Sequence, residues 1–260
     1  MIKLIASDID GTLLNDKKQL PPDFGQTLDL IESNDASFVI ASGRSYSALA
    51  VQFAEYADRL SFICDNGAFI VYDGELISIS IISKETVDEV VKCCDENGLI
   101  ALLCGKNGTY YSSSSDIYKT EIATYYNNSV YLKDLTACSD DIFKIAVFEE
   151  SGIEDHGNVI LRGKFVDRVN VALSGKRWTD LMNLGVNKGE GLKQIQKKMG
   201  IKREESAAFG DFLNDIELLG SVENSYAMEN AHERCKESAK FIIGSNNDYA
   251  VTREIRRMFG

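Results

Sequence analysis

Two aspartates near the start of the chain, Asp8 and Asp10, have the residue type and the spacing of a catalytic acid pair. Residues two apart point to opposite sides of a continuing strand, but Gly11 lets the chain turn at this point. One carboxylate can then face a metal or a substrate while the other flanks the reacting group. Two carboxylates in different surroundings can divide the work between a nucleophile and a general acid or base.

Three further polar clusters accompany this pair: Ser42-Gly43-Arg44, Lys188, and the segment 210–215 with Asp211, Asn214 and Asp215. Several carboxylates without a histidine or cysteine cluster are typical of a Mg²⁺ site rather than a zinc site. Lys188 is expected to open a helix, where a positive charge is unfavourable unless an anion lies nearby. Arg44 either pairs with an acid of the site or is solvated at a helix start.

Short apolar runs come directly before three of these four clusters, as buried parallel strands would. The expected strands cover residues 2–7, 37–41 and 206–210, and the expected helices cover 21–33, 45–57 and 189–199. This alternation is typical of a doubly wound α/β core, in which ligands bind at the carboxyl ends of the strands. The clusters that follow strands can therefore converge on one crevice.

The alternation stops in the middle of the chain. A hairpin signal at Asp73-Gly74 is followed by a helix from Ser83 to Gly98 and then by several strands, expected at 99–103, 109–112, 142–148 and 166–173. We therefore expect a Rossmann-like parallel-sheet core from residues 1–82 and 185–260, interrupted by an α+β cap domain at residues 83–184.

Composition narrows the possible partners. The 260-residue chain carries a net charge of −12 and has no clustered lysines or arginines, which argues against binding to nucleic acid or to an anionic membrane. Its N-terminal apolar stretch contains Asp8 and Asp10, and no apolar run approaches the roughly 18 residues of a membrane span. The six cysteines fit neither a disulfide framework nor zinc spacing, so we expect reduced thiols and a cytoplasmic location. No pattern indicates an oligomeric state.

The motifs resemble those of a known family. Asp8-Ile9-Asp10-Gly11-Thr12 resembles the DxDGT signature of the haloacid dehalogenase-like superfamily, and the later clusters follow in the same order as that family's motifs. The large insert between Ser42 and Lys188 is similar to that of the Cof-type phosphatases. Two other segments also resemble this subfamily, Asp65-Asn66-Gly67-Ala68 and residues 227–231. The chain departs from the subfamily at Tyr249, where glycine is usual.

The resemblance implies a role for each residue of the clusters. Asp8 would be the nucleophile that takes the phosphoryl group, and Asp10 would protonate the leaving alcohol and then activate water. Mg²⁺ would be held by the Asp8 carboxylate, the Asp10 backbone carbonyl and the Asp211 carboxylate. Asp215 would support the metal or Lys188. The phosphoryl oxygens would be bound by Ser42, Gly43, Lys188 and Asn214.

The acid at position 10 narrows the function within the superfamily. Dehalogenases lack a carboxylic acid there and P-type ATPases have threonine, so Asp10 favours a phosphatase or a phosphomutase. The sequence predicts a Mg²⁺-dependent phosphatase for small phosphorylated metabolites such as sugar phosphates, nucleotides or cofactor phosphates, with the insert as a lid that selects the leaving group. The alternatives are a phosphomutase acting on sugar phosphates and, less favoured, a phospho-aspartate regulatory protein.

Overall fold

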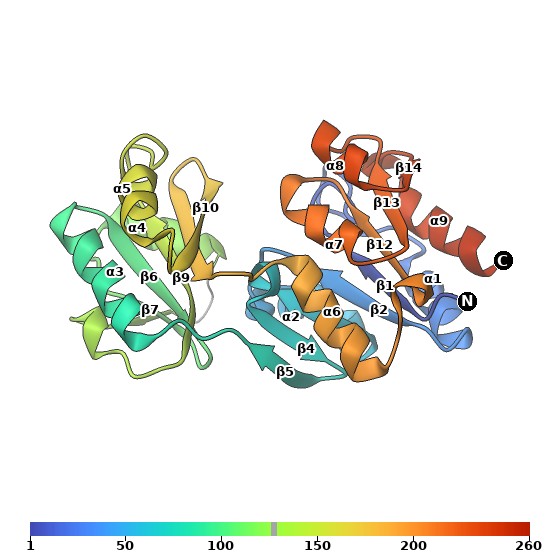
Figure 1. Cartoon of the computed structure of the whole chain (residues 1–260), viewed down its shortest axis with the longest axis horizontal. Coiled ribbons are helices and arrows are strands. Elements are labelled where there is room, and N and C mark those ends of the chain that lie inside the picture. The colour runs from blue at the N-terminus through green and yellow to red at the C-terminus, as the bar shows by residue number, and fades with distance from the viewer. Residues whose placement is uncertain (126–128) are drawn as a thin grey trace. The chain divides into compact units, whose positions relative to one another are not determined.

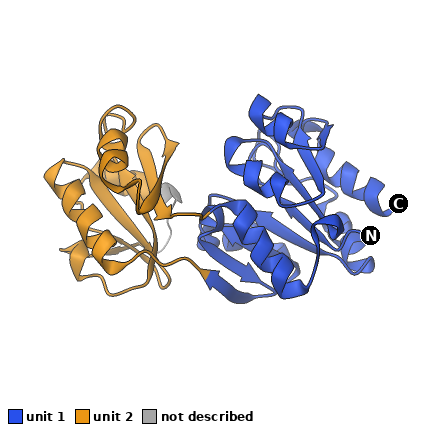
Figure 2. Cartoon of the chain, viewed as in Figure 1, with its two compact units in different colours: residues 1–78, 187–260 blue, residues 79–186 orange. Residues whose placement is uncertain are grey.

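The computed structural model describes residues 1–125 and 129–260 and divides into two compact units (Figures 1 and 2). Unit 1 contains Met1–Ser78 and Asn187–Gly260, and unit 2 contains Ile79–Val186. The domain boundaries at 82/83 and 184/185 stay a prediction. Among the described residues, no helix has both the length and the apolar character needed to cross a membrane.

Eight strands form the sheet of unit 1: β1 (Leu4–Ser7), β2 (Ser37–Ala41), β3 (Leu60–Cys64), β4 (Phe69–Tyr72), β5 (Glu75–Ile79), β12 (Ser206–Gly210), β13 (Asn224–Met228) and β14 (Phe241–Ile243). Their spatial order is β14-β13-β12-β1-β2-β3-β4-β5 (Figure 1). The six strands from β14 to β3 are parallel, and β4 pairs with β3 in the antiparallel sense. The predicted parallel-sheet core is therefore confirmed.

Six helices accompany this sheet: α1 (Phe24–Ser33), α2 (Tyr46–Gln52), α6 (Lys188–Met199), α7 (Ile216–Gly220), α8 (Glu233–Ser238) and α9 (Ala250–Phe259). Right-handed crossovers place the helices that link β1 to β3 and those that link β12 to β14 on opposite faces. Every residue of β1 and β12 is buried, which explains their continuous runs of apolar and small residues. The helix expected over 45–57 ends at Gln52, and a 3-10 turn over Ala54–Arg59 follows it.

The order in which successive strands join the sheet reverses beside β1, and this creates the place for a site. From β1 the chain passes to β2 on one side, whereas from β12 it passes to β13 on the other. Ser7, the last residue of β1, is paired with Phe209 and with Ile40, so the three strands end at the same level. Loops that leave a sheet in opposite directions open a crevice at the carboxyl ends of the strands.

Unit 2 contains a mixed sheet in the order β10-β11-β9-β6-β7-β8. Its strands are β6 (Ile100–Gly105), β7 (Thr109–Tyr111), β8 (Ser129–Tyr131), β9 (Ile142–Phe148), β10 (Val169–Gly175) and β11 (Trp178–Asn183), and its helices are α3 (Lys84–Glu96), α4 (Asp116–Tyr125) and α5 (Gly157–Phe165). All described pairings are antiparallel except β7 with β8. The α+β character of the insert is confirmed, but the sequence-based prediction lacks α4, α5, β8 and β11.

Candidate active site

The first motif lies directly beyond β1, where Asp8 is buried. The Asp8 backbone N–H donates to the carbonyl of Phe209 over 3.0 Å, which ties the end of β1 to β12. Gly11 has a φ of +85°, and a Cβ atom at that position would lie 2.4 Å from Oδ2 of Asp211. Only glycine satisfies both the left-handed backbone and the close approach of this carboxylate. The turn therefore brings the aspartates after β1 next to those after β12.

Lys188 is the centre of the buried part of the site. It is the first residue of α6, and the side chain of Asn187 caps this helix by accepting from the backbone N–H of Glu190 over 2.8 Å. The fully buried Lys188 Nζ donates to Oδ1 of Asp8 and to Oδ1 of Asp215, each over 2.6 Å. Two carboxylates of the chain thus supply the anion that a lysine at a helix N-terminus requires.

Three carboxylates meet around this lysine. Oxygen atoms of Asp8, Asp211 and Asp215 lie within 4.8 Å of one another. The Thr12 hydroxyl donates to Oδ1 of Asp211 over 3.0 Å. Asp215 accepts from Lys188 with one oxygen and, with the other, from the backbone N–H groups of Asp211 and Phe212 over 3.0 and 3.1 Å. Asp215 therefore fixes both the lysine and the loop that follows β12.

The charges of this cluster do not balance. Burial and the charge of Asp215 raise the pKa of Asp8 to about 8, although Lys188 acts in the opposite direction. Burial and Asp215 also raise the pKa of Asp211 to about 6. Burial lowers the pKa of Lys188, but the two carboxylates that it binds outweigh this effect and raise it. One positive charge faces three acids, and a divalent cation that prefers oxygen ligands, such as Mg²⁺, fits this deficit and this donor set.

The Asp10 carboxylate lies outside this cluster and between two cations. Oδ1 accepts from Lys18 Nζ over 2.6 Å and from Arg44 over 2.7 Å, and Oδ2 accepts from Nε of Arg44 over 2.9 Å. Burial would raise the pKa of Asp10, but the hydrogen bonds and charges of Lys18 and Arg44 hold it below its ordinary value. Of the two interpretations of Arg44, pairing with an acid or solvation at a helix start, the structure therefore shows the pairing.

Three of the four residues expected to bind phosphoryl oxygens, Ser42, Gly43 and Asn214, lie near Asn66. Ser42 is buried at the end of β2, and its backbone carbonyl accepts from the N–H of Asn66 over 2.9 Å. The exposed Asn214 donates from Nδ2 to Oδ1 of Asn66 over 3.0 Å. A Cβ atom at Gly43 would lie 3.3 Å from Nδ2 of Asn66. The asparagine-glycine turn after β3 is thus the structural link between these predicted residues.

Lys18 and Thr12 are site residues that the sequence analysis did not single out. Thr12 belongs to the first motif, so its place in that motif was a usable signal. Lys18 has no such signal, because its contact with Asp10 depends on a left-handed backbone conformation with a φ of 60°. Among the predicted residues, Asp8, Asp211, Asp215 and Lys188 form one cluster, and Asp10 belongs to a neighbouring group of charges.

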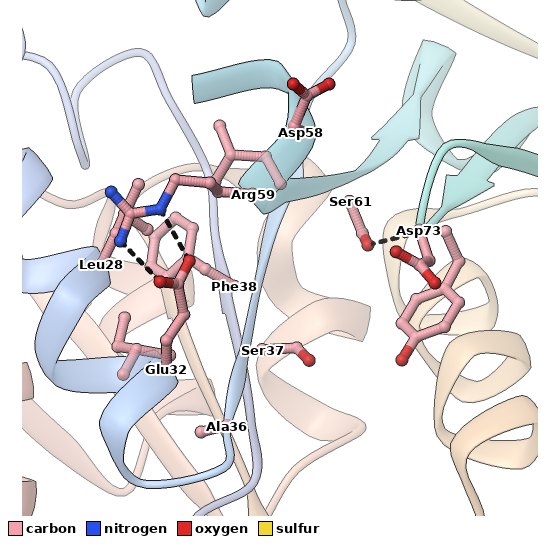
Figure 3. Close-up of a pocket in the computed structure, with 12 residues that line it drawn as sticks. Leu28, Glu32, Ala36, Ser37, Phe38, Asp58, Arg59, Ser61 and Asp73 are labelled. Carbon is pink, nitrogen blue, oxygen red and sulfur yellow. Dashed lines mark hydrogen bonds and ion pairs between the residues drawn. The ribbon is translucent and has the colours of Figure 1, made fainter. Parts of the chain in front are cut away.

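A cavity of about 250 Å³ in unit 1 lies at the opposite edge of the sheet (Figure 3). It is lined by residues at the starts of β2 and β3, including Ser37 and Ser61. The guanidinium of Arg59 is paired with Glu32 through bonds of 2.7 and 2.8 Å, and the Ser61 hydroxyl accepts from the N–H of Asp73 (Figure 3). None of the predicted site residues lines this cavity, so it is separate from the carboxylate cluster.

Comparison with known proteins gives a consistent result. The family model described as haloacid dehalogenase-like hydrolase matches residues 5–255. The 5-amino-6-(5-phospho-D-ribitylamino)uracil phosphatase YbjI of Escherichia coli K12 is 34% identical over 255 residues, covering 96% of this chain and 93% of that protein. Its Bacillus subtilis counterpart YcsE is 26% identical over 257 residues, covering 98% and 95%. A crystal structure from Eubacterium rectale is 25% identical, with a TM-score of 0.91 over 99% of both chains.

Proposed function

This chain belongs to the haloacid dehalogenase-like hydrolases and is a phosphatase of small phosphorylated compounds, and we propose that it works through a phosphoryl group carried on Asp8. The observation that carries this proposal is the buried cluster in which Lys188 binds Asp8 and Asp215 while Asp211 adds a third carboxylate. A buried carboxylate held in place by a lysine, with an independent acid two residues away, has the parts of a nucleophilic phosphoryl transfer.

The oxygen-rich cluster supports Mg²⁺ as the cofactor. With the carboxylates of Asp8 and Asp211 and the backbone carbonyl of Asp10 as ligands, Mg²⁺ when bound supplies the positive charge that the cluster lacks. Both oxygens of Asp215 are engaged by Lys188 and by backbone N–H groups, so Asp215 would act by positioning the lysine rather than as a ligand.

The first half-reaction transfers the phosphoryl group to the protein. An oxygen of Asp8 attacks phosphorus, the bond from phosphorus to the ester oxygen breaks, and that oxygen takes a proton from Asp10. Negative charge spreads over the phosphoryl oxygens during the transfer. Groups that would bind these oxygens are Lys188, the Ser42 hydroxyl, the Gly43 backbone and the Asn214 amide.

The second half-reaction restores the protein. Asp10, now ionised, takes a proton from a water molecule as the oxygen of that water attacks the phosphorus on Asp8. The bond between the Asp8 oxygen and phosphorus breaks, and inorganic phosphate leaves. Asp10 thus gains a proton from water in place of the one that left with the alcohol, and Asp8 ends as a carboxylate.

The names of the two curated relatives suggest the substrate to examine first. Both are named for hydrolysis of 5-amino-6-(5-phospho-D-ribitylamino)uracil. We extend this to the chain as the proposal that its substrate is a phosphate monoester of a primary alcohol on a polyol chain. An alkoxide is a poor leaving group, so such a substrate needs the proton of Asp10.

Release of inorganic phosphate tests the proposal. The panel contains 5-amino-6-(5-phospho-D-ribitylamino)uracil, sugar phosphates and nucleoside monophosphates, each with Mg²⁺ or with a chelator. We expect Mg²⁺-dependent release by the wild type and by Asp29→Asn, an exposed carboxylate that pairs with Arg59 on the surface, and no release by Asp8→Asn. Acid quenching during turnover should leave one phosphoryl group on the peptide that contains Asp8.

Two results would contradict the proposal. Undiminished phosphate release by Asp8→Asn would remove Asp8 as the nucleophile. Formation of an isomeric phosphate ester without release of phosphate would assign the chain to the phosphomutases instead.

A further inference from the structure

The loop that leads away from Asp10 is held from outside by asparagine side chains. Nδ2 of Asn230 donates to the carbonyl of Gly11 over 2.8 Å, and Nδ2 of Asn246 donates to the carbonyl of Leu14 over 3.0 Å. Oδ1 of Asn230 also accepts from the backbone N–H of Asn246 over 3.1 Å, which joins the two anchors. The segment that follows Asp10 is therefore a fixed element of unit 1, although it contains no helix or strand.

Asn15 organises the far end of this loop. Its Oδ1 accepts from the backbone N–H groups of Lys17 and Gln19 over 2.9 and 3.0 Å, and its Nδ2 donates to Oε1 of Gln19 over 3.1 Å. The remaining hydrogen of Nδ2 goes to the hydroxyl of Tyr249 over 2.9 Å. Since an amide group offers two donors and accepts at its oxygen, Asn15 has its full set of partners in this conformation.

Tyr249 reaches Asn15 at a conformational cost. It stands between a 3-10 turn and α9 with a φ of 54°, a left-handed conformation that a bulky residue rarely adopts. Glycine would tolerate this φ without strain but has no side chain that could reach Asn15. A strained residue persists only where surrounding contacts hold it. Here the backbone N–H of Tyr249 donates to the carbonyl of Asn246 over 3.1 Å, and its hydroxyl is bonded to Asn15.

The turn held by Asn15 carries the lysine that contacts Asp10. Lys18 lies within the turn, its N–H donates to the carbonyl of Asn15 over 2.8 Å, and its φ is 60°. From this position its Nζ reaches Oδ1 of Asp10 over 2.6 Å. A continuous series of hydrogen bonds therefore runs from the Tyr249 hydroxyl through Asn15 and Lys18 to the Asp10 carboxylate.

We propose that Tyr249 is a positioning residue for Asp10, and that it acts through Asn15 and Lys18. The inference rests on the proposed function, because it takes Asp10 as the group that gives a proton to the leaving oxygen. Proton transfer requires the carboxyl group to lie within hydrogen-bond reach of that oxygen, so a loosened turn would slow this step first. Binding of the phosphoryl group by Lys188 and Asn214 would be unaffected, because neither residue belongs to the series.

Two substrates separate this effect from a general loss of structure. An alkyl phosphate requires a proton on its leaving oxygen, whereas p-nitrophenolate leaves phosphorus without one. We expect Tyr249→Phe, assayed as the full chain with Mg²⁺, to lower alkyl phosphate turnover about tenfold, part of the larger loss caused by removing a general acid. The burst of p-nitrophenolate in the first turnover should keep its rate.

Matched variants identify the route of the effect. Tyr56→Phe makes the same chemical change on a residue of unit 1 that packs against Phe24, and it should leave both rates unchanged. In a Lys18→Met background, Tyr249→Phe should cause no further loss, because residues that act in one series are not additive. Tyr249→Gly relieves the strained φ and also removes the hydroxyl, so it should lose alkyl phosphate turnover as Tyr249→Phe does.

Two outcomes would overturn the inference. One is an unchanged ratio between the two substrates in Tyr249→Phe, whether neither rate falls or both fall equally. The other is an undiminished loss in the Lys18→Met background. Failure of this inference can be distinguished from failure of the proposed function. If Asp8→Asn were as active as the wild type, the proposed function would fail. If the wild type is active, Asp8→Asn is inactive and Tyr249→Phe keeps the wild-type ratio, only the role of Tyr249 fails.

Discussion

Asp8 and Asp10 are two residues apart, yet their electrostatic surroundings are opposite. Asp8 is buried, shares Lys188 with Asp215 and lies among three acids, so its pKa is raised to about 8 by burial and by Asp215. Asp10 is half-buried between Lys18 and Arg44, and these cations outweigh burial and hold its pKa below the ordinary value. The cluster around Asp8 has one cation for three acids. The group formed by Asp10, Lys18 and Arg44, which we call the rim, has two cations for one acid.

These pKa shifts favour a protonated Asp8 and an ionised Asp10, which is the opposite of what the proposed reaction needs. A nucleophile must be ionised, and a general acid must carry a proton. A divalent cation beside Asp8 favours the ionised carboxylate, and the anionic substrate competes with Asp10 for the charges of Lys18 and Arg44. Without ligands, the protein therefore favours the proton on Asp8 rather than on Asp10. Binding of cation and substrate together would ionise Asp8 and allow Asp10 to carry the proton.

Among changes at the rim, removing its acid should have the largest effect on turnover. Asp10→Asn keeps the shape of the side chain but can neither give nor take the proton, so kcat for an alkyl phosphate should fall by about 10²–10⁴. The first-turnover release of p-nitrophenolate should fall much less. An equal loss on both substrates would mean that Asp10 serves the fold of the loop and not the proton transfer.

Removing the only cation that contacts Asp8 in the described structure should have the largest effect on stability. Lys188→Met leaves Asp8 and Asp215 buried without their partner, and breaking a buried pair in this way costs about 3–5 kcal/mol. Lys193→Met, on the same helix, removes an exposed pair with Glu190, worth less than about 1 kcal/mol. Denaturant unfolding without Mg²⁺ measures both, and equal losses would contradict the assigned difference between the buried and the exposed pair.

The raised pKa of Asp8 should also make stability depend on pH. Between the ordinary value of 3.8 and about 8, folded Asp8 keeps a proton that the unfolded chain has lost. The folded state then binds more protons, so this contribution to stability declines as pH rises through that window. Without metal, the melting temperature of the wild type should fall relative to Asp8→Asn by a few degrees, on the order of 1 kcal/mol.

Mg²⁺ provides the internal check on this pH dependence. A cation held by the cluster replaces the proton, so metal affinity should rise with pH up to about 8 and the trend in melting temperature should disappear. A wild type that parallels Asp8→Asn at every pH without metal would show that Lys188 alone is enough to keep Asp8 ionised.

The core of the fold could be predicted because burial on both faces leaves a plain signal. The runs before Asp8, Ser42 and Asp211 are short and continuously apolar or small, and each is a buried parallel strand. In unit 2 the signal is weaker. β11 places the polar residues Thr179 and Asp180 in buried positions, which interrupts its apolar pattern. α5 contains two glycines and is held by packing of Leu161 and Phe165, which local propensity does not report.

The site residues also fall into two groups: those that a sequence motif identifies and those whose role depends on contacts with distant parts of the chain. Asp8, Asp211, Asp215 and Lys188 could be selected because their types and their places at element ends indicate a shared crevice, and the structure brings them together. Lys18 could not be selected, because its role depends on a left-handed turn fixed by Asn15 and by a tyrosine more than 200 residues away. The catalytic roles of all these residues stay predictions.

The smallest expected effect concerns the geometry of the rim rather than its charge. Arg44→Lys keeps the positive charge beside Asp10 but loses the two parallel bonds of the guanidinium, so Asp10 should be oriented less well. We expect kcat for an alkyl phosphate to fall about fivefold with little change in KM, equivalent to roughly 1 kcal/mol. Arg59→Lys is the matched control, because it breaks a similar two-bond contact with Glu32 at the opposite edge of the sheet. If Arg44→Lys kept full activity, charge alone would be sufficient at the rim, and the orientation of Asp10 would depend on Lys18 and the turn that carries it.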